Sequence, residues 1–97
     1  MKNKENDTRK SEKDLIQAIL SLESIEESRE FFEDLCTPAE FEAMADRWLV
    51  VQKLSKGLSY REIAKETGVS VTTVTRVARC LNRENSGYKK IYERVLK

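Results

Sequence analysis

The sequence predicts an all-α protein of about six helices that includes a helix-turn-helix. From Leu15 onwards, apolar residues recur at helical spacing, and no stretch alternates with the period of two that a half-buried strand requires. Serine or threonine followed three residues later by glutamate marks several helix starts. The 97 residues include only three glycines and one proline, too few turn residues for a β-sandwich. At this length the chain holds one small domain.

The first part of the chain divides into an arm and two helices. Residues 1–13 carry no apolar side chain after Met1, so we expect a disordered N-terminal arm before a helical domain at residues 14–97. Apolar residues at helical spacing predict the first helix: Leu15, Ile16, Ile19, Leu20 and Leu22. Ser24 and Glu27 form a capping box for a second helix, whose apolar face is Ile25, Phe31, Phe32 and Leu35.

A third, longer helix begins at the segment Thr37-Pro38-Ala39-Glu40. Thr37 is suited to cap it, and Pro38 fits the first helical position, where its missing N–H costs nothing. The helix is expected to end at Gly57. It is apolar over more than half of its circumference, which places it at the centre of the core or in a dimer interface.

Two short helices and the turn between them form a predicted helix-turn-helix at about residues 59–82. Ser59 with Glu62 opens the first helix, and Ser70 caps the second. Gly68 permits the positive φ of a sharp turn, and Ala64 is small where the two helices cross. Four apolar residues then hold the helices to each other and to the core: Ile63, Val69, Val74 and Val77. After Ser86-Gly87, a final amphipathic helix carries Tyr88, Ile91, Tyr92, Val95 and Leu96.

The outer face of the second short helix suits a DNA major groove. Arginine grips guanine bidentately, and threonine contacts a thymine methyl group or a phosphate. We expect four residues to read bases: Thr72, Thr73, Arg76 and Arg79. Five more are expected to contact the DNA backbone: Ser59, Arg61, Lys65, Ser70 and Arg83. The charge distribution agrees, because residues 59–97 hold nine Lys/Arg against four Asp/Glu, whereas residues 1–58 hold nine against thirteen.

Other classes of function lack their residues. The chain has no histidine, and its two cysteines, Cys36 and Cys80, are far apart in sequence, so we expect no metal site and no cofactor. Neither thiol has a histidine to activate it, and the carboxylates lie on predicted solvated faces, so no catalytic residue is expected. No apolar run approaches the roughly 20 residues of a membrane helix, and residues 1–13 do not have the composition of a signal peptide. We therefore expect a soluble cytoplasmic protein.

The stretch LCTPAEFEAMADRWLVVQKLSKGLSYREIAKETGVSVTTVTRVARCL, residues 35–81, resembles the Trp repressor family. The shared features are the Thr-Pro-x-Glu opening, the long apolar helix ending in Lys-Gly, the Ser-x-Arg-Glu start and the Thr-x-Thr-Arg recognition helix. The resemblance implies an intertwined all-helical homodimer that binds a palindromic operator in double-stranded DNA, with its two recognition helices about one DNA turn apart. It is closest to the family's less characterised YerC/YecD-type paralogues.

The tryptophan-sensing members of that family imply a candidate small-molecule pocket at five positions: Thr37, Arg47, Arg76, Val77 and Cys80. Val77 stands where the sensor has glycine beside the indole, and Cys80 stands where it has serine. Because a valine side chain fills that space and a hydrogen bond is lost, we do not expect tryptophan to bind. Whether another effector binds stays open, and Arg47 also suits an ion pair with a neighbouring carboxylate such as Asp46. An alternative function is a helical dimeric protein–protein interaction module without specific DNA binding.

Overall fold

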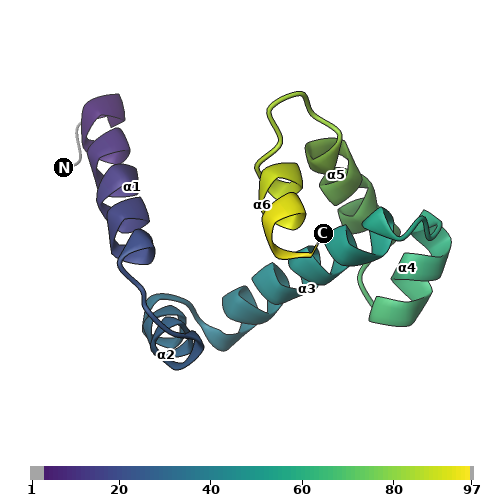
Figure 1. Ribbon diagram of the computed structural model, residues 1–97, viewed down its shortest axis with the longest axis horizontal. Helices are drawn as coiled ribbons and strands as arrows, with labels where there is room; N and C mark the ends of the chain where they lie inside the picture. Colours follow the sequence, from purple (N-terminus) through teal and green to yellow (C-terminus); the bar gives the residue numbers. More distant parts are fainter. Residues whose placement is uncertain (1–3, 97) are drawn as a thin grey trace. The chain divides into compact units, whose positions relative to one another are not determined.

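A computed structural model of the chain describes residues 4–96, and within these residues it contains six α-helices and no β-strand. This confirms the all-α class (Figure 1). The helices are α1 (Lys4–Leu20), α2 (Ile25–Leu35), α3 (Pro38–Ser55), α4 (Tyr60–Thr67), α5 (Val71–Leu81) and α6 (Gly87–Val95). The chain divides into two compact units between Thr37 and Pro38, so α1 and α2 form one unit and α3–α6 form the other.

In the first unit, helix α1 differs from the expected arm. We predicted disorder for residues 1–13, but α1 begins at Lys4 and continues without a break to Leu20. Lys, Glu, Arg and Gln are good helix formers, and charged pairs four residues apart support an exposed helix without a core. Lys10 and Asp14 form one such pair, with 3.0 Å between Nζ and Oδ2. Residues 1–3 of the expected arm lie outside the described residues.

Helix α2 starts at the predicted serine cap, with the serine half of the predicted capping box present. The Glu27 N–H donates to Ser24 Oγ at 3.0 Å, which satisfies one of the free N–H groups of the first turn. The first unit has no core of its own, however. Among residues 7–37 no side chain is buried, and Leu20 and Ile25 are 78% and 77% exposed.

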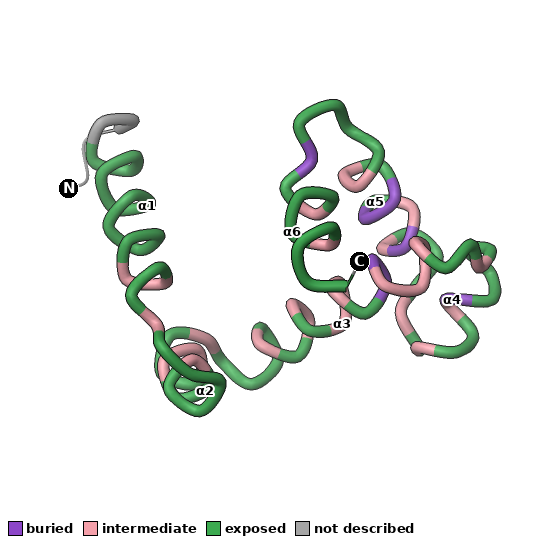
Figure 2. Tube along the Cα trace, in the orientation of Figure 1, coloured by how far each residue is buried: buried purple, intermediate pink, exposed green. Residues whose placement is uncertain are grey.

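The second unit is built around the C-terminal half of α3. Five side chains are completely buried and form its core: Val50 and Val51 of α3, Ile63 of α4, and Val74 and Val77 of α5. Figure 2 shows these buried positions where α3, α4 and α5 meet. The other half of α3 contributes less, because Phe41 and Met44 are only half-buried. The last turns of α3 therefore lie at the centre of the core, as the sequence predicts for this helix.

Helix α6 packs against both α3 and α5. Its cap, Ser86, is 2% exposed and accepts a hydrogen bond from the Lys89 N–H at 3.1 Å. The rings of Tyr88 and of Trp48 on α3 lie 6.5 Å apart between centroids. Trp48 is therefore a packing residue in the second unit. Helices α3 and α6 thus form a small helical platform: α3 contacts both α4 and α5, and α6 contacts α5.

Candidate nucleic-acid interface

Helices α4 and α5 form the predicted helix-turn-helix on that platform. The side chains of Ile63, Val74 and Val77 are fully buried, and Ala64 and Val69 pack against them. Gly68 ends α4 with φ +78°, and its N–H donates to the Ala64 carbonyl at 2.9 Å. Glycine is required here because that backbone conformation costs other residues free energy.

Both helices begin with the predicted caps. At α4, the Glu62 N–H donates to Ser59 Oγ at 3.1 Å, and the Ser59 N–H donates to Glu62 Oε1 at 3.2 Å. At α5, the Thr73 N–H donates to Ser70 Oγ at 3.1 Å, and the Ser70 hydroxyl donates to Thr73 Oγ1 at 3.0 Å. The capping box at α4 and the serine cap at α5 fix where each helix starts and thus which side chains face outwards.

A row of exposed residues, which we call the α5 stripe, consists of Thr72, Arg76 and Arg79 on the outward face of α5 and Arg83 just beyond its end. The spacing of four and three residues places Thr72, Arg76 and Arg79 on one side of the helix. The opposite side carries the buried Val74 and Val77. No acidic residue occurs in α5, and among the side chains of residues 7–96 none of the three guanidinium groups has an ion-pair partner. The stripe therefore presents positive charge to solvent.

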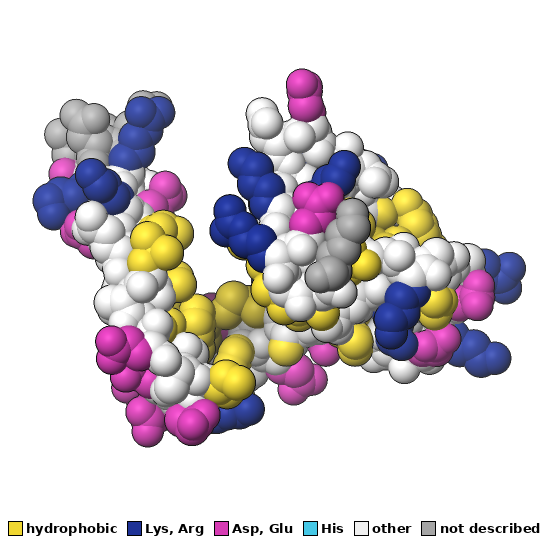
Figure 3. Space-filling model, in the orientation of Figure 1, with side chains coloured by type: hydrophobic (Ala, Val, Ile, Leu, Met, Phe, Trp, Pro, Cys, Tyr) yellow, Lys and Arg dark blue, Asp and Glu magenta, His cyan; other side chains and the backbone are white. Residues whose placement is uncertain are grey.

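Helix α4 adds two more exposed cations, Arg61 and Lys65, which also form no ion pair in the described part of the chain. Figure 3 shows basic side chains over the α4 end of the second unit and along α6, with a few acidic ones among them, whereas acidic side chains gather over α2. As the charge distribution of the sequence predicts, α2 is mainly acidic and the helix-turn-helix is mainly basic. A polyanion is attracted to the basic part.

Other expected DNA-contacting residues lie beside the α5 stripe. Thr73 is half-buried on the flank of α5, and its hydroxyl already takes part in the Ser70 cap. Ser59 and Ser70 are exposed at the starts of α4 and α5, where their side-chain oxygens accept backbone N–H groups. The structure thus gives these three residues capping roles.

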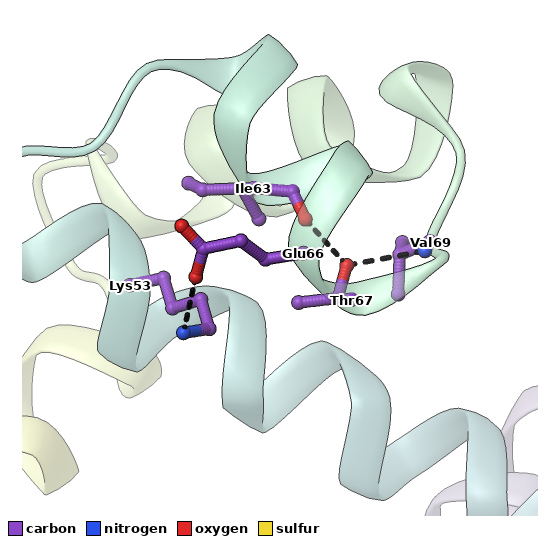
Figure 4. A network of polar contacts seen from close by, with 5 residues as sticks. All are labelled: Lys53, Ile63, Glu66, Thr67 and Val69. Carbon is purple, nitrogen blue, oxygen red and sulfur yellow. Dashed lines mark hydrogen bonds and ion pairs between the residues drawn. The ribbon is translucent and has the colours of Figure 1, made fainter.

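Two features of this region escaped the sequence analysis. Val71, at the first position of α5, is 48% exposed, although an apolar residue at a helix start is usually expected to be buried. The second is Thr67, whose hydroxyl donates to the Ile63 carbonyl at 2.7 Å and accepts from the Val69 N–H at 3.1 Å (Figure 4). A threonine beside the turn glycine was the only sequence signal for it.

The five residues of the candidate small-molecule pocket are divided between the two units. Thr37 belongs to the first unit, and Arg47, Arg76, Val77 and Cys80 belong to the second. Val77 is completely buried in the core, Arg76 is exposed, and Arg47 and Cys80 are half-buried. Arg47 forms no ion pair with any side chain of residues 7–96. Asp46 is therefore not its partner.

The second unit contains a cavity of about 490 Å³ that none of those five residues lines. It lies between the ends of α3 and α5 and the side of α6, and its walls are Leu54, Ser55, Leu81, Asn82, Arg83, Lys89, Tyr92 and Glu93. Among the described residues, no cluster of three or more thiol, imidazole or carboxylate side chains has the arrangement of a metal site. No helix within residues 4–96 is long and apolar enough to cross a membrane.

Comparison with known proteins agrees with this geometry. The family model described as Trp repressor protein matches residues 10–96. The chain belongs to the Trp repressor family. That family consists of DNA-binding regulators and not of enzymes, in keeping with the exposed, basic helix-turn-helix.

Individual relatives support the family assignment along most of the chain. The uncharacterized protein YerC of Bacillus subtilis is 44% identical over 81 residues, which cover 84% of this chain and 78% of YerC. The Trp operon repressor homolog of Chlamydia caviae is 34% identical over 77 residues, covering 78% of this chain and 76% of that protein. The crystal structure of a TrpR-like protein from Eubacterium eligens superposes with a TM-score of 0.82 at 41% identity, covering 88% of each chain.

Proposed function

We propose that this Trp repressor family member is a homodimeric, sequence-specific transcriptional repressor that binds a palindromic operator. The observation that carries the proposal is the α5 stripe, with three exposed arginines and no acidic neighbour on the helix. A regulator of this kind acts where the DNA is, which in a bacterial cell is the cytoplasm.

In this proposal each exposed group has a defined role. Arg76 and Arg79 donate to guanine, and Thr72 contacts a thymine methyl group, with Thr73 contributing from the flank of the helix. Arg61 and Lys65 on α4 and Arg83 after α5 bind phosphates, together with the helix starts at Ser59 and Ser70. Phosphate contacts position the protein, whereas the base contacts select the sequence.

A second copy of the chain covers the apolar residues that one copy leaves exposed. In α1 and α2 these include Ile16, Leu20, Ile25 and Leu35, and in α6 they include Ile91 and Val95. Where such side chains gather into one contiguous apolar patch, the patch is typical of a protein–protein interface. Two-fold symmetry then presents two α5 helices to successive major grooves, about 34 Å apart along the DNA.

Tryptophan is not the corepressor in this proposal. The Val77 side chain is completely buried among Val50, Val51, Ile63 and Val74, so it already fills space in the core. Admitting an indole beside it requires the core to move, and overpacking of this kind typically costs about 1–3 kcal/mol. The chain should bind its operator equally well with and without tryptophan.

The test is selection of duplex DNA from a random library by the purified chain, without tryptophan. Recovery of a palindrome with half-sites about one turn apart supports the proposal. Affinity for that palindrome should fall steeply as salt rises, because phosphate contacts release counterions. Recovery of no sequence, with weak binding that depends little on salt, would instead favour the protein–protein interaction module, for which the acidic α2 and the exposed apolar side chains of the first unit are the supporting features.

A further inference from the structure

The junction between α4 and α5 carries a set of polar contacts that the proposed DNA contacts do not use. Lys53 near the end of α3 and Glu66 in the last turn of α4 form an ion pair, with 2.8 Å between Nζ and Oε1. The next residue, Thr67, makes its two hydrogen bonds to the Ile63 carbonyl and the Val69 N–H. We call Lys53, Glu66 and Thr67 the α4 latch (Figure 4).

We propose that Thr67 is a positioning residue for DNA recognition, which sets the direction in which α5 leaves the turn, and that the Lys53–Glu66 ion pair holds the same end of α4 on α3. This inference rests on the proposed DNA-binding function. It adds residues that act through α5 rather than by reading bases themselves.

The Thr67 hydroxyl joins two backbone groups on opposite sides of the turn. The Ile63 carbonyl lies within α4, four residues before Thr67, whereas the Val69 N–H lies beyond Gly68, where the chain has already reversed. Thr67 and Val69 are both half-buried, so water replaces the hydroxyl only in part. Valine has nearly the shape of threonine but can neither donate nor accept. Thr67→Val therefore removes both bonds while keeping the packing volume.

The series of contacts continues from the turn into α5. Val69 is followed by Ser70, whose side chain caps α5 at Thr73. The position of Thr67 Oγ1 thus fixes Val69, and Val69 leads directly into the α5 cap. Because α5 has 11 residues, it is about 16 Å long, and a tilt of about 5° at its start moves its far end by more than about 1 Å. Productive contacts require placement within about 0.5 Å, so such a tilt disrupts base reading by Arg76 and Arg79.

The ion pair makes a smaller contribution than the threonine. The side chains of Lys53 and Glu66 are 24% and 47% exposed, so solvent screens the attraction. The ion pair matters because of where it lies: it joins α3 to the last turn of α4, directly before Thr67. Reversal of both charges preserves the attraction, which makes the pair suitable for a swap experiment.

The experiment measures affinity for the operator selected by the wild-type chain and for a scrambled duplex of equal length. We expect Thr67→Val to lower the ratio of the two affinities about tenfold, the change associated with loss of an ordinary hydrogen bond. Binding to the scrambled duplex and the slope of affinity against salt should stay unchanged, because the cations remain. Thr67→Ser keeps the hydroxyl and should restore the ratio to within about twofold.

A matched control is available on α2, where the Ser28 hydroxyl donates to the Ser24 carbonyl at 2.7 Å, four residues back as in Thr67. Ser28→Ala should leave the ratio unchanged. The proposal is overturned if Thr67→Val keeps the wild-type ratio, or if Thr67→Ser loses as much as Thr67→Val.

The charge pair decides the matter if Thr67→Val does not fold, as judged by circular dichroism. Lys53→Glu and Glu66→Lys alone should each lower the ratio about threefold, within the range measured for exposed ion pairs, and the double variant should recover it. Failure of the double variant to recover overturns the positioning role of the latch. A wild-type chain that selects no DNA sequence overturns the proposed function as well, so the two failures are distinguishable.

Discussion

The two units of the chain differ in how much apolar surface each covers by itself. The second unit buries Val50, Val51, Ile63, Val74 and Val77 completely, from three different helices. The first unit buries no side chain among residues 7–37, although its helices carry isoleucine, leucine and phenylalanine at helical spacing. Helical periodicity therefore predicts where apolar faces lie but not what covers them. The second unit covers its own apolar faces, whereas the first leaves Leu20 and Ile25 largely exposed.

The largest expected effect comes from replacing exposed apolar side chains of α1 that the proposed dimer buries. Replacing Ile16 and Leu20 by glutamine removes two large apolar side chains, and the helix is preserved because glutamine is a good helix former. If a second copy buries both, each homodimer loses four buried apolar side chains, about 6–12 kcal/mol, and the dimer dissociation constant rises at least about 10,000-fold. Sedimentation equilibrium measures it. Lys13→Gln, at an exposed polar position of the same helix, should leave dimerisation unchanged. A double variant that dimerises like wild type would remove α1 from the interface.

The next effect sharpens the contrast by testing the core of the second unit. Ile63→Ala leaves a cavity among the buried valines, so we expect the free energy of unfolding to fall by about 2–5 kcal/mol. Arg61→Ala on the same helix, at an exposed position, should change it by less than about 0.5 kcal/mol. Urea denaturation followed by circular dichroism compares the two. Equal losses would mean that α4 is not anchored through its buried face.

DNA binding should separate the units by function. Arg76→Ala is expected to cost about 1–3 kcal/mol of operator affinity and to relax specificity at one base pair of each half-site. The matched variant Arg29→Ala, at an exposed arginine of α2, should have no effect. Fluorescence anisotropy with single-base operator variants measures both. A uniform loss on every sequence would show that Arg76 contacts only phosphate.

The smallest effect concerns two glycines of the second unit. Gly68→Ala forces a side chain into φ +78°, so we expect a loss of about 1 kcal/mol even though nothing lies within 4 Å of the added Cβ. Gly87, in the first turn of α6, has the same free space and no positive φ, so Gly87→Ala should stabilise by about 0.4–1 kcal/mol. Thermal unfolding of the two variants should shift in opposite directions. A shift in the same direction would contradict the role given to the backbone at Gly68.

Much of the fold was predictable because helix ends depend on residues within a few positions of each other. The caps at Ser24, Ser59 and Ser70 and the left-handed turn at Gly68 were all expected and are all present. The start of α1 was not expected, since the prediction treated a segment without apolar residues as unable to order. Helix propensity and pairs such as Lys10–Asp14 support a helix that has no apolar face.

The sequence alone also determined which side of α5 faces outwards, because the buried valines and the exposed arginines repeat with the helical period. The tertiary structure decided how α4 is held. Lys53 and Glu66 are 13 residues apart, and no local pattern pairs them; they meet because α3 and α4 pack together around Ile63. Local sequence fixes short-range hydrogen bonds and periodicity, whereas contacts between helices arise only once the core brings the helices together.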